Sequence, residues 1–349
     1  MFRFLLFFVL ASALVCSALL GAMWYPNIKP LPVSEPATWS TGDVEIAGSL
    51  FKADGERPRP AIVFMTGSGG SPALEIGVVR AHVRNLTAAG YAVLVFDRRG
   101  TGASGGTFRD WTFQDLASDL NGAYEWLAKQ PGVDADRIGT VAISQGWWIS
   151  VQAAQQSDIN RFIVGIGAPA TTPAEQEEWV LESEMRSAGF NESTAPAIGL
   201  LRMRNNVLRG TVSKEAYEHE QTAYNDERWY ITLKHWFTLG DGNHPYWQWY
   251  RGIFDYNPVD DIRALNAPLA VFQGENDVLV DPKKTVATYN KLAREGVDVD
   301  VFSLPNVGHD LSNRVTLPIL HNKAFPRQWP RRYWNELESW LQTKGFADS

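Results

Sequence analysis

The sequence predicts an α/β fold in which a mostly parallel central sheet is flanked by helices. From about Trp39 onward, short runs of β-branched and aromatic residues alternate with longer amphipathic stretches, which is typical of a parallel sheet covered by helices. The runs are apolar nearly throughout, as expected of strands buried on both faces. We expect the central strands at residues 61–65, 92–96, 138–143, 162–166, 269–272 and 299–304.

The composition is that of an ordinary globular protein with one unusual feature. A chain of 349 residues can bury a sizeable core without disulfides or a structural metal. Its 45% hydrophobic and 20% charged residues exclude a disordered, collagen-like or coiled-coil chain. The net charge of −7 gives no electrostatic reason to bind a phosphate backbone, so nucleic acid is not expected as a partner. The 14 tryptophans are unusually many.

Residues 1–24 differ in character from the rest of the chain. No charged residue occurs between Arg3 and Lys29, and the apolar run of residues 4–23 is long enough to cross a bilayer. The segment predicts either a cleaved signal peptide or an uncleaved membrane anchor, so we expect the globular part to be exported, as a periplasmic, secreted or membrane-anchored protein. The only cysteine, Cys16, lies in this segment. Catalysis by cysteine and a zinc–thiolate site are therefore excluded from the exported part.

Residues 171–256 interrupt the alternation of strands and helices. This stretch lacks a convincing buried strand, and its pattern is helical and polar. We expect a helical cap inserted into a single domain of residues 39–349, because a long insertion at strand ends often serves as a lid or specificity element. A separate helical subdomain without a catalytic role is the alternative. The insertion contains Trp179, Trp229, Trp236, Trp247 and Trp249.

Ser144 is the candidate nucleophile. It lies in RIGTVAISQGWWISVQAAQ, where an expected strand, a sharp turn and a helix follow one another, which is the context of a nucleophile elbow. Gly146 meets the steric demand of such a turn, whereas Ala142 replaces the first glycine of G-x-S-x-G. A literal match to that motif occurs instead around Ser104, but no helix starts directly after this glycine-rich loop. Context therefore favours Ser144.

A serine nucleophile needs a histidine that takes its proton. His309 follows the expected strand 299–304 in the loop LPNVGHDLS, so it lies at the carboxyl end of a strand, where ligands of such sheets bind. His309 is therefore the candidate base. The competing histidines are His219, His235 and His244 in the insertion, His82 on an amphipathic helix and His321 in a basic, proline-containing tail segment.

The histidine in turn needs an acid that holds its tautomer and orientation. Glu275, Asp277 and Asp281 all follow the expected strand 269–272. Asp277 is favoured by its spacing from Gly274, and Asp281 before Pro282 is explained by capping of the next helix. The chain order Ser144, Asp277, His309 is that of α/β-hydrolases and differs from the orders of chymotrypsin and subtilisin.

Acyl transfer also needs backbone N–H groups that stabilise the developing oxyanion. Gln145, directly after the nucleophile, is expected to supply one of them. The other is expected from TGSGGS after the strand 61–65, with Ser68 as first choice and Gly69 as second. This loop lacks the Lys-Ser/Thr ending of a phosphate-binding P-loop.

At these residues the sequence resembles the α/β-hydrolase superfamily, and most closely bacterial carboxylesterases of the dienelactone-hydrolase-like and serine-aminopeptidase-like group. The matching segments are FMTGSGGS, VFDRRGTGASGG, DADRIGTVAISQG, FDYNPVDDIRALNAPLAVFQGENDVLV and LPNVGHD. The resemblance implies the α/β-hydrolase fold and an acyl-enzyme mechanism without a metal or organic cofactor. Ser144, Asp277 and His309 match its triad positions. Trp147 stands where a second small residue often follows the elbow, so it either shapes the acyl pocket as a substrate-binding residue or packs under the cap.

Four functions are compatible with these features. The leading one is hydrolysis of a small to medium apolar carboxylic ester, because apolar walls with a few polar groups suit such substrates. A peptidase or thioesterase with the same triad is the second, and a catalytically silent binding protein is the third. The fourth is activity on lipids, with the first 24 residues and the tryptophans at a bilayer.

Overall fold

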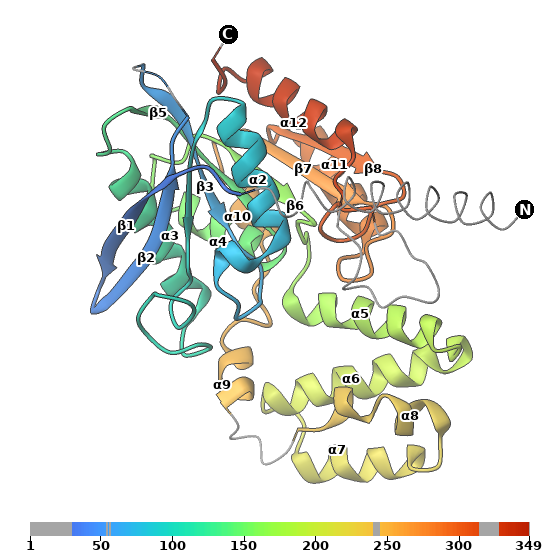
Figure 1. Cartoon of the computed structure of the whole chain (residues 1–349). Helices are drawn as coiled ribbons and strands as arrows, with labels where there is room; N and C mark the ends of the chain where they lie inside the picture. The colour runs from blue at the N-terminus through green and yellow to red at the C-terminus, as the bar shows by residue number, and fades with distance from the viewer. Residues whose placement is uncertain (1–29, 54, 56, 240–244, 314–327, 349) are drawn as a thin grey trace, which may run out of the picture.

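The computed structural model describes residues 30–53, 55, 57–239, 245–313 and 328–348. Within these residues eight strands form one sheet in the order β1-β2-β4-β3-β5-β6-β7-β8 (Figure 1). The strands from β3 to β8 pair in parallel, so the α/β class and the mostly parallel sheet are confirmed. The strands are β1 (Ser34–Thr41), β2 (Val44–Phe51), β3 (Arg59–Met65), β4 (Ala92–Phe96), β5 (Val133–Ile143), β6 (Ile163–Ile166), β7 (Leu269–Gly274) and β8 (Val299–Leu304).

The strands β1 and β2 were not among the six expected ones. They form an antiparallel hairpin at the edge of the sheet, and β1 begins at Ser34, before the expected start of the domain at residue 39. Most of β1 is exposed or half-buried, so it has no apolar run of the kind that marks the central strands. The hairpin turns at Gly42, whose φ of 58° suits a tight two-residue connection.

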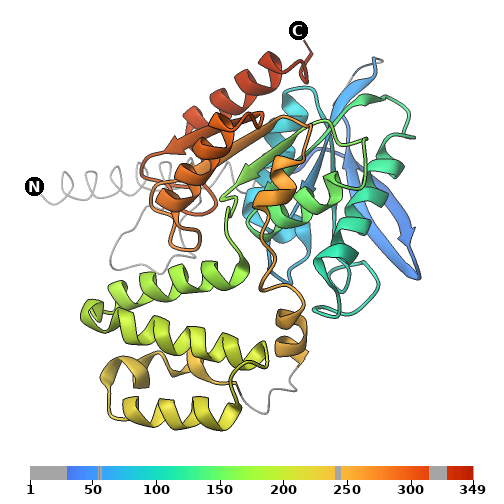
Figure 2. The same ribbon diagram turned by 180° about the vertical axis from the view of Figure 1, so that it is seen from behind.

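Helices cover both faces of the sheet (Figures 1 and 2). One face packs against α2 (Gly77–Ala88) and α12 (Arg331–Thr343), and the other packs against α3 (Phe113–Leu127), α4 (Gln145–Ala154) and α11 (Pro282–Arg294). Successive residues of β3 alternate between the two cores: Ile62 faces α2 and α12, whereas Val63 faces α3 and α4. This burial on both faces explains why the central strands are apolar throughout.

The segment between β6 and β7 is helical. Figure 2 shows its helices stacked as a layer beside the carboxyl end of β6. Thr172 and Glu175 form a capping box that starts α5 at Pro173, close to residue 171, where the insertion was expected to begin. The helices of the segment are α5 (Pro173–Ser187), α6 (Thr194–Leu208), α7 (Lys214–Gln221), α8 (Arg228–Thr232) and α9 (Pro245–Arg251), and α10 (Val259–Arg263) leads into β7.

The expected signal peptide or membrane anchor, residues 1–24, lies outside the described residues. Among the residues that the structure does describe, no helix combines the length and the apolar character that a membrane span requires.

Candidate active site

Ser144 occupies a strained turn between β5 and α4. Its backbone has φ 55° and ψ −124°, a conformation that residues other than glycine rarely adopt. A Cβ at Gly146 would lie 2.5 Å from the carbonyl oxygen of Met65, so only glycine lets α4 start this close to β3. Ala142 is fully buried, and its neighbour in register on β6 is Gly165, so the sheet accommodates the extra methyl group.

Asp277 and His309 are hydrogen-bonded to each other. His309 Nδ1 lies 2.8 Å from Asp277 Oδ2, and Gln273 Nε2 donates to the same oxygen at 2.9 Å. The other oxygen of Asp277 accepts the backbone N–H groups of Leu279 and Val280 at 2.8 and 2.9 Å. The carboxylate is completely buried, whereas the imidazole is 14% exposed. These contacts hold the acid rigidly and leave His309 Nε2 free to face another group.

Gly167 lies between the serine and the histidine. The N–H of Ser144 donates to the carbonyl of Ile166 at 2.9 Å, and a Cβ at Gly167 would lie 2.8 Å from both Cε1 and Nδ1 of His309. The structure therefore brings Ser144, Asp277 and His309 to one end of the sheet. Among the described residues, neither Ser144 Oγ nor His309 Nε2 has a hydrogen-bond partner. Catalytic hydrogen bonds are often long before substrate binds.

The glycine-rich loop after β3 runs beside the serine. A Cβ at Gly67 would lie 3.3 Å from the Cβ of Ser144. The next residues, Ser68 and Gly69, are exposed. Gln145 is the first residue of α4, so its N–H belongs to the turn whose N–H groups have no acceptor within the helix. The three expected oxyanion residues therefore lie on the two chain segments that border Ser144.

Arg98 joins these two segments, and the sequence did not point to it. Its Nη1 donates to Gln145 Oε1 at 2.8 Å, and its Nη2 donates to the carbonyl of Gly69. The residue is 2% exposed. Its position in the loop after β4 was the available signal, because such loops lie at the carboxyl edge of the sheet. Gly167 and Gln273 were missed as well, although Gly167 directly follows β6 and Gln273 is the penultimate residue of β7.

The alternative serine and acids have structural contacts. Ser104 Oγ donates to the carbonyl of Asp97 at 2.5 Å and accepts the N–H of Ala47 at 2.9 Å. Asp281 caps α11 through the N–H groups of Lys283 and Lys284, as its place before Pro282 predicts. Glu275 accepts a hydrogen bond from Ser303 Oγ at the surface.

The other described histidines lie away from Ser144. His82 is fully buried against α12, with its ring nitrogens 2.7 Å from the carbonyl oxygen of Val78 and 2.6 Å from the hydroxyl of Tyr333. Burial lowers the pKa of His82 to about 4. His219 and His235 are exposed on the insertion. His244 and His321 lie outside the described residues.

Trp147 lies in the core instead of at an open surface. Its ring is completely buried and contacts Tyr289 of α11 edge-on, with the ring centroids 5.8 Å apart. A Cβ at Gly165 would lie 2.4 Å from this indole, so the absence of a side chain on β6 makes room for it. The ring has no exposed surface to offer to a substrate in this structure, and its contacts with α11 and β6 place it in the core of the body rather than under the cap.

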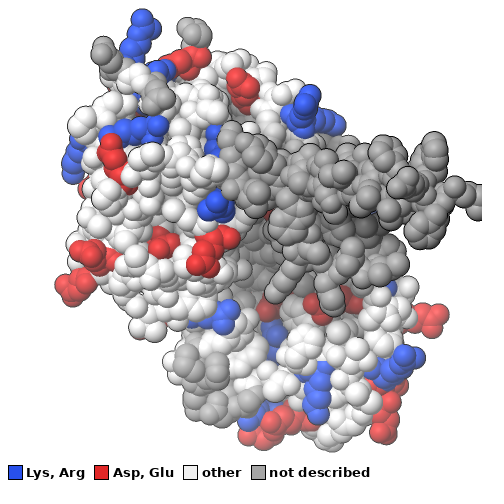
Figure 3. Space-filling model, viewed as in Figure 1, with Lys and Arg blue, Asp and Glu red and all other residues white. Residues whose placement is uncertain are grey.

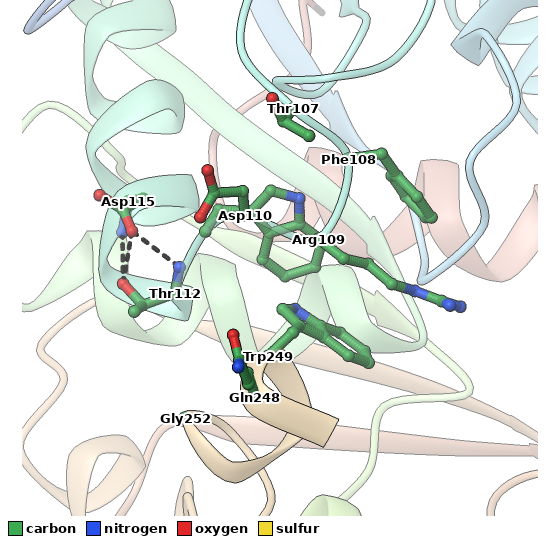
Figure 4. A pocket seen from close by; sticks show the side chains of 10 residues that line it. Thr107, Phe108, Arg109, Asp110, Thr112, Asp115, Gln248, Trp249 and Gly252 are labelled. Carbon is green, nitrogen blue, oxygen red and sulfur yellow. Dashed lines mark hydrogen bonds between the residues drawn. The ribbon is translucent and has the colours of Figure 1, made fainter. Parts of the chain in front are cut away.

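The insertion meets the body of the protein at a cavity of about 560 Å³. Figure 4 shows the loop of Phe108 and Arg109 opposite α9, with the Arg109 side chain running past the indole of Trp249. The guanidinium of Arg109 lies 4.8–5.1 Å from the ring centroids of Phe108, Tyr246 and Trp249. Phe108 also contacts the glycine loop, since a Cβ at Gly70 would lie 3.2 Å from its ring.

Charge is distributed without a dominant sign on the face shown in Figure 3, where basic and acidic side chains are interspersed over the described residues. Within the described part of the chain, no group of three or more His, Cys, Asp or Glu side chains could hold a metal ion.

Comparison with known proteins assigns the chain to a family. A model of the X-Pro dipeptidyl-peptidase (S15) family matches residues 43–309, which is more than half of the chain and includes all three triad candidates. Two uncharacterised proteins from strains of Mycobacterium tuberculosis are 28% identical over 160 residues, a region that covers 41% of this chain. The match spans 54%, about half, of the length of those relatives.

Solved structures agree in fold. An esterase of Pyrococcus furiosus superposes with a TM-score of 0.54 at 16% identity, covering 89% of this chain and 91% of the esterase. The acylaminoacyl peptidase of Pyrococcus horikoshii superposes with a TM-score of 0.55 at 17% identity, covering 94% of this chain and 44% of the peptidase. These similarities confirm the α/β-hydrolase fold.

Proposed function

Because this chain belongs to the X-Pro dipeptidyl-peptidase (S15) family of α/β-hydrolases and is therefore a serine hydrolase, we propose that Ser144, His309 and Asp277 are its catalytic triad and that it cleaves carboxylic esters. The observation that carries this proposal is the 2.8 Å contact between His309 Nδ1 and the buried Asp277, next to a serine in a strained turn. The free nitrogen of the same imidazole is then available to the serine hydroxyl.

The mechanism follows from these positions. His309 Nε2 takes the proton of Ser144 as the hydroxyl attacks the ester carbonyl, and the buried Asp277 keeps Nδ1 protonated and stabilises the imidazolium. The N–H groups of Gln145 and of Ser68 or Gly69 stabilise the oxyanion. His309 then gives its proton to the departing alkoxide, and water attacks the acyl-enzyme in a second, equivalent step.

The charges near the site favour an ester over the dipeptide substrate that the family name suggests. Removal of a dipeptide requires recognition of a free amino terminus, which is a cation. The side chain that joins Gln145 and Gly69 is the cationic Arg98, and burial and the charge of Arg109 lower the pKa of Arg98 to about 10. Asp97 in the same loop is turned toward the N–H groups of Ala73 and Ala103. A neutral ester avoids the repulsion that an ammonium group would meet here.

A comparison of two chromogenic substrates tests this proposal. We expect p-nitrophenyl butyrate to be hydrolysed with a kcat/KM at least 100-fold above that for Ala-Pro-p-nitroanilide, and Ser144→Ala to abolish both reactions. The absence of ester turnover by a folded wild-type protein would contradict the proposal. A preference for the anilide would support the second candidate, a peptidase, which the family name favours.

A further inference from the structure

Arg98 connects two parts of the site that are far apart in the sequence. One is the first turn of α4, held through Gln145 Oε1, and the other is the loop after β3, held through the carbonyl of Gly69. Three glycines, Gly67, Gly69 and Gly70, give this loop great conformational freedom. A planar guanidinium with donors in fixed directions restricts both segments at once.

The other buried arginines show how unusual Arg98 is. Arg99, the next residue, forms a two-point ion pair with the buried carboxylate of Asp119 at 2.6 and 2.7 Å. Arg204 in the insertion is likewise 2% exposed, and it pairs with Glu177 at 2.5 Å. Among the described residues, Arg98 has no carboxylate partner, and burial lowers its pKa to about 10. A buried charge without a counterion is costly, so its retention calls for a function.

Arg98 binds both of the segments that border the place where a negative charge would develop. Both groups that it binds belong to the segments expected to donate to the oxyanion, and no carboxylate among the described residues pairs with it. We propose, on the basis of the triad function proposed above, that Arg98 is a positioning residue: it sets the spacing of the two oxyanion-binding segments, and its unneutralised charge stabilises the tetrahedral intermediate. Such preorganised charge acts on the transition state more than on the substrate.

The aromatic residues beside Arg98 keep this charge in place. The guanidinium lies 5.4 Å from the ring centroid of Trp111, and Trp111 contacts Trp249 of α9 edge-on at 5.3 Å. Trp249 in turn lies against Arg109. The π-faces of these rings attract a cation without neutralising it, unlike a carboxylate. The stack therefore anchors Arg98 while its positive charge remains available to the site.

Substitution of Arg98 by methionine tests the proposal, with Arg204→Met as a matched control. Both residues are 2% exposed arginines beside a tryptophan, but only Arg98 contacts the site. In Arg98→Met we expect kcat for p-nitrophenyl butyrate to fall about 100-fold with KM changed less than threefold, the size of effect seen when an oxyanion donor is lost. Affinity for a trifluoromethyl ketone, which mimics the tetrahedral intermediate, should fall by the same factor. Arg98→Lys, which retains the charge, should recover part of the loss.

Substitution of Gln145 by methionine provides a second test, which does not depend on the stability of Arg98→Met. This change removes the acceptor of Arg98 but retains the backbone N–H of residue 145, and we expect a loss in kcat of about tenfold. In the double variant of Arg98→Met with Gln145→Met, the loss in kcat should be much smaller than the product of the two single losses, because both changes remove the same contact.

The proposal is overturned if folded Arg98→Met retains kcat and inhibitor affinity within twofold, or loses no more than Arg204→Met. It is equally overturned if Gln145→Met has no effect on kcat. Each of these results would leave the esterase function intact, since that function is judged by wild-type turnover and its loss in Ser144→Ala.

Discussion

The serine and the histidine of the candidate site differ from another serine and histidine of the molecule in how many hydrogen bonds their side chains make. At the carboxyl end of the sheet, Ser144 Oγ and His309 Nε2 have no partner among the described residues, and the serine backbone is strained at φ 55°. In the loop after β4, Ser104 Oγ binds Asp97 and Ala47, and on α2 both nitrogens of His82 are hydrogen-bonded. Ser144 and His309 thus have unused hydrogen-bonding atoms, whereas those of Ser104 and His82 are occupied.

This difference distinguishes side chains that can take part in a reaction from side chains that stabilise the fold. A side chain whose donors and acceptors are all used stabilises the fold, but it has nothing left to offer a substrate. A hydroxyl in a strained turn beside an imidazole with a free nitrogen contributes little to stability, and its cost is understandable only as part of a reaction. Variants of either pair of side chains test this distinction, and the expected effects differ by orders of magnitude.

The largest effect is expected for Ser144→Ala. Loss of the nucleophile should reduce kcat for p-nitrophenyl butyrate by about 10⁴- to 10⁶-fold, since other groups of the site contribute only residual catalysis. Labelling by a fluorophosphonate should disappear as well, and the melting temperature should stay close to that of the wild type, because Ser144 Oγ has no hydrogen-bond partner among the described residues and alanine fits the same backbone. Retention of labelling would move the nucleophile to another residue.

Asp277→Asn should come next, with a loss of about 10⁴-fold in kcat. The amide keeps the shape of the side chain but would favour the wrong tautomer of His309. Fluorophosphonate labelling of Ser144 should slow in parallel. Glu275→Gln in the same loop is the control, because its contact with Ser303 lies at the surface and its turnover should remain within twofold of wild type. If both variants lost activity equally, loop disruption would explain the result better than a triad.

His82 is expected to make the stability of the protein sensitive to acid. Burial lowers its pKa from 6.5 to about 4. His82 is therefore protonated below about pH 6.5 in the unfolded chain, but only below about pH 4 in the folded chain. Stability is therefore lost as the pH falls through this window, by about 3 kcal/mol in total. Urea unfolding from pH 7 to 4 should show this loss in the wild type, and His82→Gln should show a flatter dependence. Identical slopes for the two proteins would refute this assignment.

Gly167→Ala changes the candidate site without removing any of its polar groups. The new methyl group would lie 2.8 Å from the ring of His309, so the imidazole must move, and we expect kcat to fall about 100-fold. Gly42→Ala is the matched control: its φ of 58° resembles the 52° of Gly167, but a Cβ there meets nothing within 4 Å. The control should lose stability without losing kcat. Equal kcat in both variants would mean that His309 need not lie against Gly167.

The local patterns in the sequence predicted the central strands and the triad candidates because each depends on residues close together in the chain. Ser144 differs from Ser104 in the element that comes directly after it, which is a helix for Ser144 and a loop for Ser104. The roles of Arg98 and Gly167 depend on contacts across 29 or more residues, which no local pattern contains. The hairpin of β1 and β2 was missed because its strands are partly exposed. The burial of the Trp147 ring could not be predicted locally either, because the space for it is left by Gly165 on a separate strand, β6.

The smallest effect is expected for Ser104→Ala, although this serine is the one that matches G-x-S-x-G. The variant loses one donated and one accepted hydrogen bond and leaves the N–H of Ala47 unpaired, which should cost about 1–2 kcal/mol of stability. Turnover should stay within twofold of wild type, because the hydroxyl already has two partners and none of them is His309. Urea unfolding and ester assays on the same preparation measure both quantities. A large loss of kcat without a loss of stability would show that a fully hydrogen-bonded side chain is not thereby a structural one, and the distinction between the two pairs of side chains would fail.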